Sequence, residues 1–262
     1  MSMRLITVST ALTIAATGLL STPAIAATGL LSTPAVAAAT PSVVYGFAWS
    51  DGAGALRVLP RRGAMKSSGG VRSWTLKALA GAKEVRLDYR AAVYNRVTTA
   101  CDLVETEGHV ALTKFGFGKT RCTPADLTDA LTRGPVPARI VYQGTKAVSV
   151  NEFLTGESAD RTQRGTITRV NDTTFTFTGK TGTEKLGYVY TLAFNRATAK
   201  CGDAWLSGKP ANADKKGRGT RACDFSAFTK ALKSAGRPVT VELLYNPLRQ
   251  EALDITEISS GA

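Results

Sequence analysis

The sequence predicts a β-rich α+β protein made of two tandem copies of one unit behind an export signal. Three observations predict it: an apolar N-terminal run that ends in small residues, a segment that recurs later in the chain, and short stretches of alternating apolar and polar residues. We expect each copy to be a five-stranded antiparallel sheet or an OB-like barrel, with one short helix between strands 3 and 4.

The first element is a signal peptide. Arg4 precedes an apolar run from Leu5 to Leu20, and small residues in Ala-x-Ala order follow. The end of this segment is duplicated, so cleavage after Ala26 and after Ala37 both fit, and we favour the second because the repeated stretch lacks a folded domain's pattern. No later apolar run is long enough for a membrane span, so we expect a secreted, extracellular protein without integral membrane association. The expected organisation is a signal peptide at 1–38, a first repeat domain at 40–156 and a second at 160–262.

The internal repeat is the most specific signal in the sequence. Three segments recur in the same order: 94–102 as 194–203, 120–122 as 220–223, and 147–153 as 252–258. Conserved order with small length changes in loops indicates a duplication. Each cysteine pair lies inside one copy, so we expect the disulfides Cys101–Cys122 and Cys201–Cys223, which an exporting compartment permits.

In the second copy, alternating residues and turn signals predict five strands around one helix. The strands expected are 165–170, 174–178, 188–194, 238–245 and 253–258. The helix begins after Asp224, a good N-cap, carries an apolar stripe from Phe225 to Leu232, and ends at Gly236.

The first copy repeats this plan with one insertion. Thr123 is the expected N-cap, Pro124 occupies the first helical position, and Gly134 ends the helix. The insertion at 65–82 contains Trp74 and falls between the second and third strands.

The charge of the chain favours anionic partners. The formal net charge is +13, and residues 40–157 and 158–262 share the basic excess equally. A basic surface attracts nucleic acid, cell-wall polymers and acidic sugars. In the second copy the loop between the cysteines contains Trp205, Lys215, Lys216 and Arg218, an aromatic among cations, as in OB-like folds that bind charged polymers. A solvated, non-functional loop is the alternative.

A strand that ends in a cysteine, a Gly-containing loop, a second cysteine at a helix and two final strands together resemble the secreted subtilisin-inhibitor family. The residues that carry the resemblance are Gly108-His109, Cys122, Ala125-Asp126-Leu127, Ala130 to Gly134, Gly144 to Phe153 and Pro238-Val239. The resemblance implies inhibition of an extracellular serine protease, with Arg133 or Arg237 presented on the connection from helix to strand and Arg139 close by. The family's second disulfide, beside the reactive bond, is absent from both copies, and rigidity of the loop is what gives such inhibitors affinity.

Signatures of catalysis are sparse. His109 is the single histidine, and the second copy has none at the matching position. Glu105, Glu107 and His109 alternate and would share a face of a strand, which fits a divalent ion or, as we expect, a solvated face. Gly118-Lys119-Thr120 lacks the first glycine of a P-loop, because Thr113 stands in its place. We therefore expect no enzyme, no catalytic residues, no metal and no cofactor.

Two functions remain after this reading. The first is a secreted, non-enzymatic binding protein that acts on another protein, with serine-protease inhibition as its specific form. The second is a basic OB-like module that binds polyanions such as nucleic acid, cell-wall polymer or acidic sugar, which would show as strong salt dependence of binding.

Overall fold

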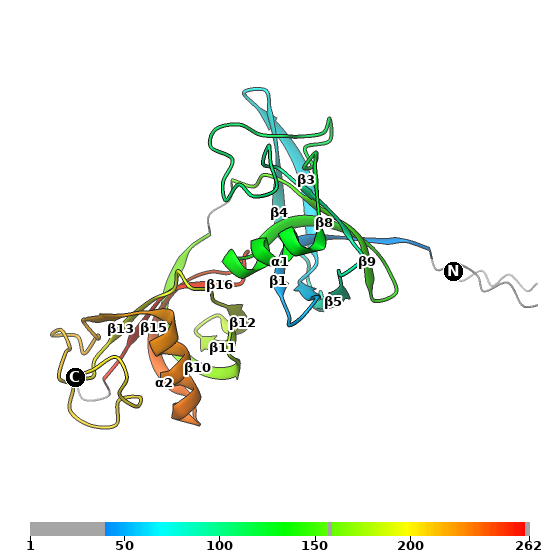
Figure 1. Ribbon diagram of the computed structural model, residues 1–262. Coiled ribbons are helices and arrows are strands. Elements are labelled where there is room, and N and C mark those ends of the chain that lie inside the picture. The colour runs from blue at the N-terminus through cyan, green and yellow to red at the C-terminus, as the bar shows by residue number, and fades with distance from the viewer. Residues whose placement is uncertain (1–39, 157–158, 260–262) are drawn as a thin grey trace, which may run out of the picture. The chain divides into compact units, whose positions relative to one another are not determined.

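The computed structural model describes residues 40–156 and 159–259, which we call the N-terminal and C-terminal halves (Figure 1). The predicted signal peptide at 1–38 lies outside the described residues. The two halves contain separate β-sheets, and each half has one helix: α1 (Pro124–Arg133) in the first and α2 (Phe225–Ala235) in the second. No described helix has the length and apolarity needed to cross a membrane.

The N-terminal half is a nine-stranded sheet in which five strands pair in a closed circuit. Its strands are β1 (Ser42–Ser50), β2 (Ala55–Val58), β3 (Arg61–Ser68), β4 (Val71–Ala78), β5 (Val85–Asp88), β6 (Val93–Arg96), β7 (Thr120–Cys122), β8 (Val136–Gln143) and β9 (Lys146–Glu152). The pairings run β1–β2–β5–β9–β8 and return to β1. Only the β5–β9 pairing in this circuit is parallel, and it joins Asp88 to Lys146. Tyr94, Leu127 and Ile140 are among the fully buried residues of the core that the circuit and α1 enclose.

The C-terminal half is a seven-stranded sheet that closes into a five-stranded barrel. Its strands are β10 (Arg161–Asn171), β11 (Thr174–Gly179), β12 (Gly182–Gly187), β13 (Ala193–Arg196), β14 (Arg221–Cys223), β15 (Val239–Asn246) and β16 (Glu251–Glu257). The barrel pairings run β10–β11–β12–β16–β15 and return to β10, with the single parallel step at Gly187 and Glu251. Phe175 and Phe194 both pack edge-on against Phe228 in its core.

Both helices begin and end where the sequence predicts. The Thr123 hydroxyl accepts a hydrogen bond from the Asp126 backbone, and the Asp126 carboxylate accepts one from the Thr123 backbone, which forms a capping box. The Asp224 carboxylate accepts a bond from the Ala227 N–H at 2.9 Å. Gly236 ends α2 in the left-handed conformation that glycine adopts without strain.

Of the two alternatives expected for each copy, an open antiparallel sheet does not describe either half, because β6 and β13 also pair in parallel with β9 and β16. The predicted strand at 188–194 is wrong. The third strand of the C-terminal half is β12, and the chain then turns, with the Leu192 N–H bonded to the Val189 carbonyl, before β13 begins. Alternation of buried residues continues across this turn because Tyr188 and Leu192 both point into the core, so the sequence pattern does not reveal it.

The predicted insertion forms the β3–β4 hairpin, which projects from the sheet of the N-terminal half (Figure 1). Its only ladder contact with the sheet is at Tyr45 and Arg61, the first residue of β3. The backbone N–H of Trp74 also donates a hydrogen bond to the Leu154 carbonyl at 2.7 Å. The hairpin therefore adds a ribbon to the barrel circuit without interrupting it.

Candidate polyanion-binding surface

One face of the β3–β4 hairpin is a row of cations. The strand register places Arg62 directly opposite Lys77, and Lys66 lies four residues beyond Arg62 on the same face. All three side chains are exposed. Arg72 is also exposed near the tip of the hairpin, but it stands opposite Ser67 and so lies on the other face, next to Trp74 and Gly116. The hairpin contains no acidic residue. We call Arg62, Lys66, Arg72 and Lys77 the basic ribbon.

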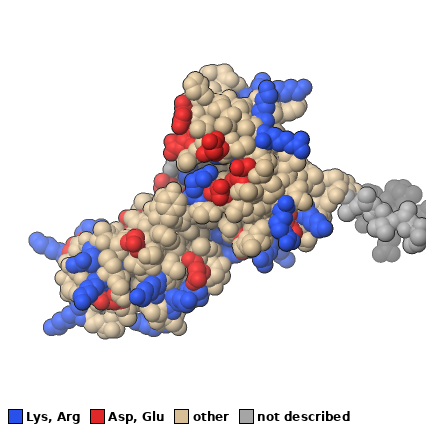
Figure 2. Space-filling model, viewed as in Figure 1, with Lys and Arg blue, Asp and Glu red and all other residues tan. Residues whose placement is uncertain are grey.

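The cations of the basic ribbon are not neutralised within the described chain. Ion pairs of the described residues involve other arginines and lysines, and none includes a member of the basic ribbon. At the end of the N-terminal half where Figure 1 places the hairpin, Figure 2 shows Lys and Arg side chains on one side and Asp and Glu side chains on the other. Unpaired like charges on adjacent strands repel each other, so this arrangement disfavours folding unless an anion binds.

The opposite face of the hairpin is held by aromatic packing. The Trp74 ring stacks on Phe117 with centroids 4.9 Å apart and also packs against Tyr45 and Phe153. Arg139, a predicted binding residue, lies in β8 with its guanidinium 5.5 Å from the centre of the Phe117 ring. This aromatic cluster fixes which face of the hairpin is exposed, because its apolar side is already in use.

A tight turn beside the hairpin adds an aromatic and a further cation. The Phe117 carbonyl accepts a bond from the Thr113 N–H, and Gly116 has a φ of 74°, so the turn presents Lys114 and Phe115 at its tip. Phe115 is 56% exposed, and its carbonyl accepts a hydrogen bond from the Trp74 indole. An exposed ring next to cations can stack on a base while the cations bind the backbone of a nucleic acid.

The C-terminal half contains a similar turn that presents the predicted residues Lys215 and Lys216. The Arg218 carbonyl accepts a bond from the Asp214 N–H, and Gly217 has a φ of 73°. Both lysines are exposed. Arg218, in contrast, pairs with Asp214 at 2.8 Å and with Glu242 at 3.4 Å, so its charge is largely neutralised. Arg218 donates one hydrogen bond from its backbone N–H and one from its guanidinium to the Asp214 carboxylate, and these bonds lower the pKa of Asp214 to about 2.

Buried arginine–glutamate pairs hold the loops that carry these turns. In the C-terminal half, Arg196 donates to the Cys201 and Asp203 carbonyls and pairs with Glu257 at 3.3 Å. In the N-terminal half, Arg96 donates to the Cys101 and Leu103 carbonyls. Each guanidinium thereby holds the first residues of the loop between two cysteines, and the disulfide joins the two ends of that loop.

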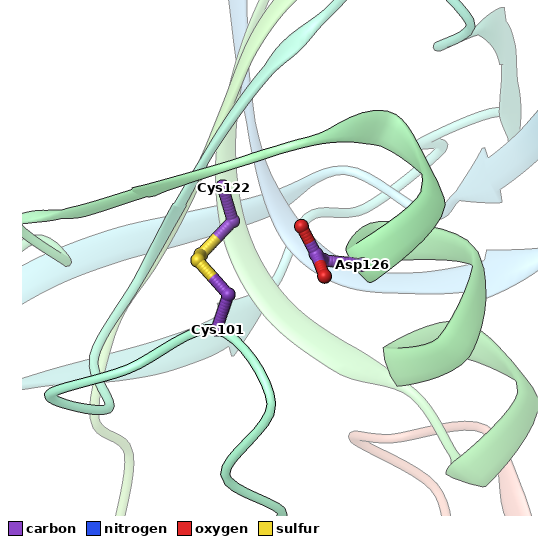
Figure 3. A group of neighbouring side chains, drawn as sticks. All are labelled: Cys101, Cys122 and Asp126. Atoms are coloured by element: carbon purple, nitrogen blue, oxygen red, sulfur yellow. A yellow bond between two sulfur atoms is a disulfide. The ribbon is translucent and has the colours of Figure 1, made fainter.

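The two disulfides are as predicted, Cys101–Cys122 and Cys201–Cys223. Figure 3 shows Asp126 next to the first of them, a group of three potential metal ligands. Both sulfurs are committed to the disulfide, and the carboxylate already accepts bonds from the backbone and hydroxyl of Thr123. These three residues are therefore a poor metal site.

The remaining predicted binding residues lie apart from the basic ribbon. Trp205 is only 8% exposed and stacks on Phe194 in the core, so its indole cannot act as the exposed aromatic that we expected. Arg133 is the half-buried last residue of α1. Arg237 is exposed between Gly236 and Pro238. The hairpin cations were not predicted, although the absence of acidic residues from the insertion is a signal for them.

The chemistry available to this surface is attraction and stacking, without covalent steps. Arg62, Lys66 and Lys77 lie exposed on one face of the hairpin, and Arg72 lies on the other, next to the turn that presents the exposed Phe115 ring. Among these residues the structure describes no nucleophile with an adjacent base. A scan against family models, a search of curated proteins and a search of solved structures each found no match.

Proposed function

We propose that this protein is a secreted, non-enzymatic binding protein whose N-terminal half binds polyanions through the basic ribbon and the 113–116 turn. The observation that carries the proposal is the position of Arg62 opposite Lys77 on an exposed ribbon without an acidic residue. Cross-strand repulsion has a cost in stability, and a bound polyanion would offset it. Phe115 then supplies stacking contact for ligands that have bases.

The proposal includes a fold assignment: the two halves are copies of one OB-like unit. Both halves contain the same circuit of five strands, and in both the helix lies between the third and fourth of these strands in chain order. In both circuits the single parallel pairing joins the third strand to the fifth, which supports a common fold. The buried pairs of Arg96 with Glu152 and of Arg196 with Glu257 support it further. OB-like barrels commonly bind extended polymers, although fold alone does not assign function.

Secretion is part of the same proposal. Two disulfides are compatible with an extracellular protein, since they persist in oxidising compartments. The apolar segment before residue 38 provides the export signal in this interpretation. An extracellular setting makes cell-wall polymers and extracellular nucleic acid the polyanions that the protein would meet.

Protease inhibition has less geometric support. An inhibitory residue must be presented on a preorganised, accessible loop. Arg133 is helical and half-buried, and Arg237 occupies a connection of a few residues between α2 and β15. Residual subtilisin and trypsin activity in the presence of the purified protein tests this alternative directly, and stoichiometric inhibition would restore it.

The experiment that tests polyanion binding measures affinity as a function of salt concentration. Fluorescently labelled oligodeoxythymidine and polyphosphate are the probes, and uncharged dextran is the control ligand. For the oligonucleotide, the double variant Arg62→Ala/Lys77→Ala should reduce the slope of log K against log salt by about 1.4, at roughly 0.7 for each lost phosphate contact. Phe115→Ala should weaken the binding of the oligonucleotide and leave the binding of polyphosphate unchanged, because polyphosphate has no base to stack.

The matched control is Lys146→Ala, an exposed lysine in β9 outside the basic ribbon. This variant should leave the slope of log K against log salt unchanged for the oligonucleotide and for polyphosphate. If neither polymer binds in a salt-dependent way, or if Lys146→Ala reduces the slope as much as loss of Arg62 and Lys77, the proposal is wrong.

A further inference from the structure

The buried ion pair of the C-terminal half is covered by a peptide segment of its own chain. The Ala204 carbonyl accepts a hydrogen bond from Arg196 Nη2 at 2.8 Å, and the Leu206 N–H donates to Glu257 Oε1 at 2.7 Å. Between these two groups the Trp205 indole packs into the core against Phe194. Arg196 and Glu257 are consequently fully buried, with 0% of either side chain exposed.

The corresponding pair of the N-terminal half lacks this cover. Glu105 occupies the position of Trp205 in the repeat register and is exposed to solvent. Arg96 Nε lies 3.8 Å from Glu152 Oε2 and is buried without a hydrogen-bond partner among the described residues. Both hydrogen bonds from described residues to the Glu152 carboxylate, those of Tyr94 and Val97, end on Oε2, which leaves Oε1 without the backbone donor that Glu257 Oε1 has.

A cavity of about 310 Å³ lies over this incompletely covered pair. Arg96 and Glu152 contribute to its lining, and its other walls come from the end of α1, the 134–137 connection, residues 104–105 and Tyr190. The Arg96 side chain is 4% exposed, so the cavity is lined by a nearly buried guanidinium that is only partly satisfied: its Nη1 donates to the Cys101 and Leu103 carbonyls, and its Nε has no partner among the described residues. Buried polar atoms in proteins normally have partners, and a partnerless one beside a cavity points to a ligand.

We infer that this cavity binds an extended peptide segment of a partner protein, centred on an aromatic residue. The carbonyl before the aromatic residue would accept a bond from the Arg96 guanidinium, and the N–H after it would donate to Glu152 Oε1. The aromatic ring fills the space beside α1. The C-terminal half supplies the template, since Ala204, Trp205 and Leu206 make these three interactions within the chain.

This inference concerns a site separate from the basic ribbon and does not depend on polyanion binding. The peptide would contribute uncharged backbone groups and an apolar ring to a site whose two charges already face each other, so its affinity should depend little on salt. Lys77→Glu, which alters the basic ribbon, should leave peptide affinity within twofold.

The test uses a fluorescently labelled, capped peptide with the sequence of residues 203–207, Asp-Ala-Trp-Leu-Ser, titrated with the purified protein. We expect saturable binding, and at least tenfold weaker binding when the tryptophan of the peptide is replaced by alanine. The protein variant Glu105→Trp should also weaken binding at least tenfold, because it provides an indole in cis where the C-terminal half has one. Glu105 is exposed, so this variant should fold, which circular dichroism would verify.

Lys146→Trp adds an indole at an exposed position away from the cavity and should bind the peptide as the parent protein does. The inference is overturned if the peptide shows no saturable binding at concentrations up to about 1 mM. It is equally overturned if Glu105→Trp binds as tightly as the parent protein, since the peptide would then occupy a different site.

Discussion

Arg62 and Lys77 lie directly opposite each other across the β3–β4 ladder, both exposed and neither paired with an acidic residue of the described chain. Opposed like charges on neighbouring strands destabilise a hairpin. A protein under selection for stability alone would place an acidic residue at one of these positions. The proposed polyanion binding and the stability of the hairpin therefore make opposite demands on this pair.

Replacing Lys77 with glutamate should stabilise the protein while it weakens polyanion binding. The change converts a repulsive pair into an attractive one, for which we expect a gain in the free energy of unfolding of about 0.5–1 kcal/mol. Urea denaturation at low salt measures the gain, and high salt should reduce it. Lys146→Glu is the comparison, and an equal gain there would show that only net charge matters.

Substitution should destabilise the protein more at the fully buried Arg196–Glu257 pair than at the partly exposed Arg96–Glu152 pair. Glu257→Gln leaves Arg196 as an uncompensated charge in a fully buried site, and we expect a loss of about 3–5 kcal/mol. Glu152→Gln should cost less, because Glu152 is 14% exposed and burial raises its pKa, so the folded state already disfavours the charged form that glutamine lacks. Thermal and urea unfolding of the two variants compare them directly, and equal losses would contradict the difference in cover.

Glu152 should make the stability of the protein depend on pH. Burial raises the pKa of this carboxyl above its ordinary value of 4.5. The folded state then binds a proton more tightly than the unfolded state, so this group's contribution is fully present below pH 4.5 and is lost as pH rises through the folded pKa. Stability measured from pH 4 to pH 8 should show this decline, and Glu152→Gln should remove it. A variant with the same pH profile as the parent protein would argue against the raised pKa.

Asp214 should titrate far below an ordinary aspartate. The backbone N–H and the guanidinium of Arg218 both donate to its carboxylate, and its pKa is lowered to about 2. Its stabilising contribution is therefore present above pH 3.8 and is lost as pH falls toward 2. Carboxyl NMR titration measures the pKa. In the Arg218→Ala variant the pKa of Asp214 should rise but stay below 3.8, because the backbone N–H groups of residues 216 and 218 still donate to the Asp214 carboxylate. An unchanged pKa would show that the guanidinium has no part.

Local signals were sufficient for the elements whose determinants are close together in the chain. Thr123 and Asp224 are N-caps because a short polar side chain reaches an N–H two or three residues ahead. The cysteines pair within their own segments, which the recurrence of those segments indicated. The β10–β11 hairpin follows from alternation on either side of a turn at 171–173.

Which side chains are exposed depended on contacts between distant segments. Trp205 lies in a basic loop that reads as solvent-exposed, but the Glu257 carboxylate holds the following Leu206 N–H and the core receives the indole. In the N-terminal half Glu105 stays in solvent at the matching position, and a cavity is left in its place. A basic loop and a buried tryptophan are compatible, since burial is decided by strands far away in the sequence.

The sequence alone was enough to predict a β-rich chain, its disulfides, its helix boundaries and the place of the β3–β4 insertion, because caps, turns and strand alternation act over a few residues. The tertiary structure decided the parallel steps that close the strand circuits, the face of the hairpin that carries Arg62 and Lys77, and the unequal cover of the two arginine–glutamate pairs. These features depend on which strands become neighbours, and that choice is made by burial of the whole core rather than by any local pattern.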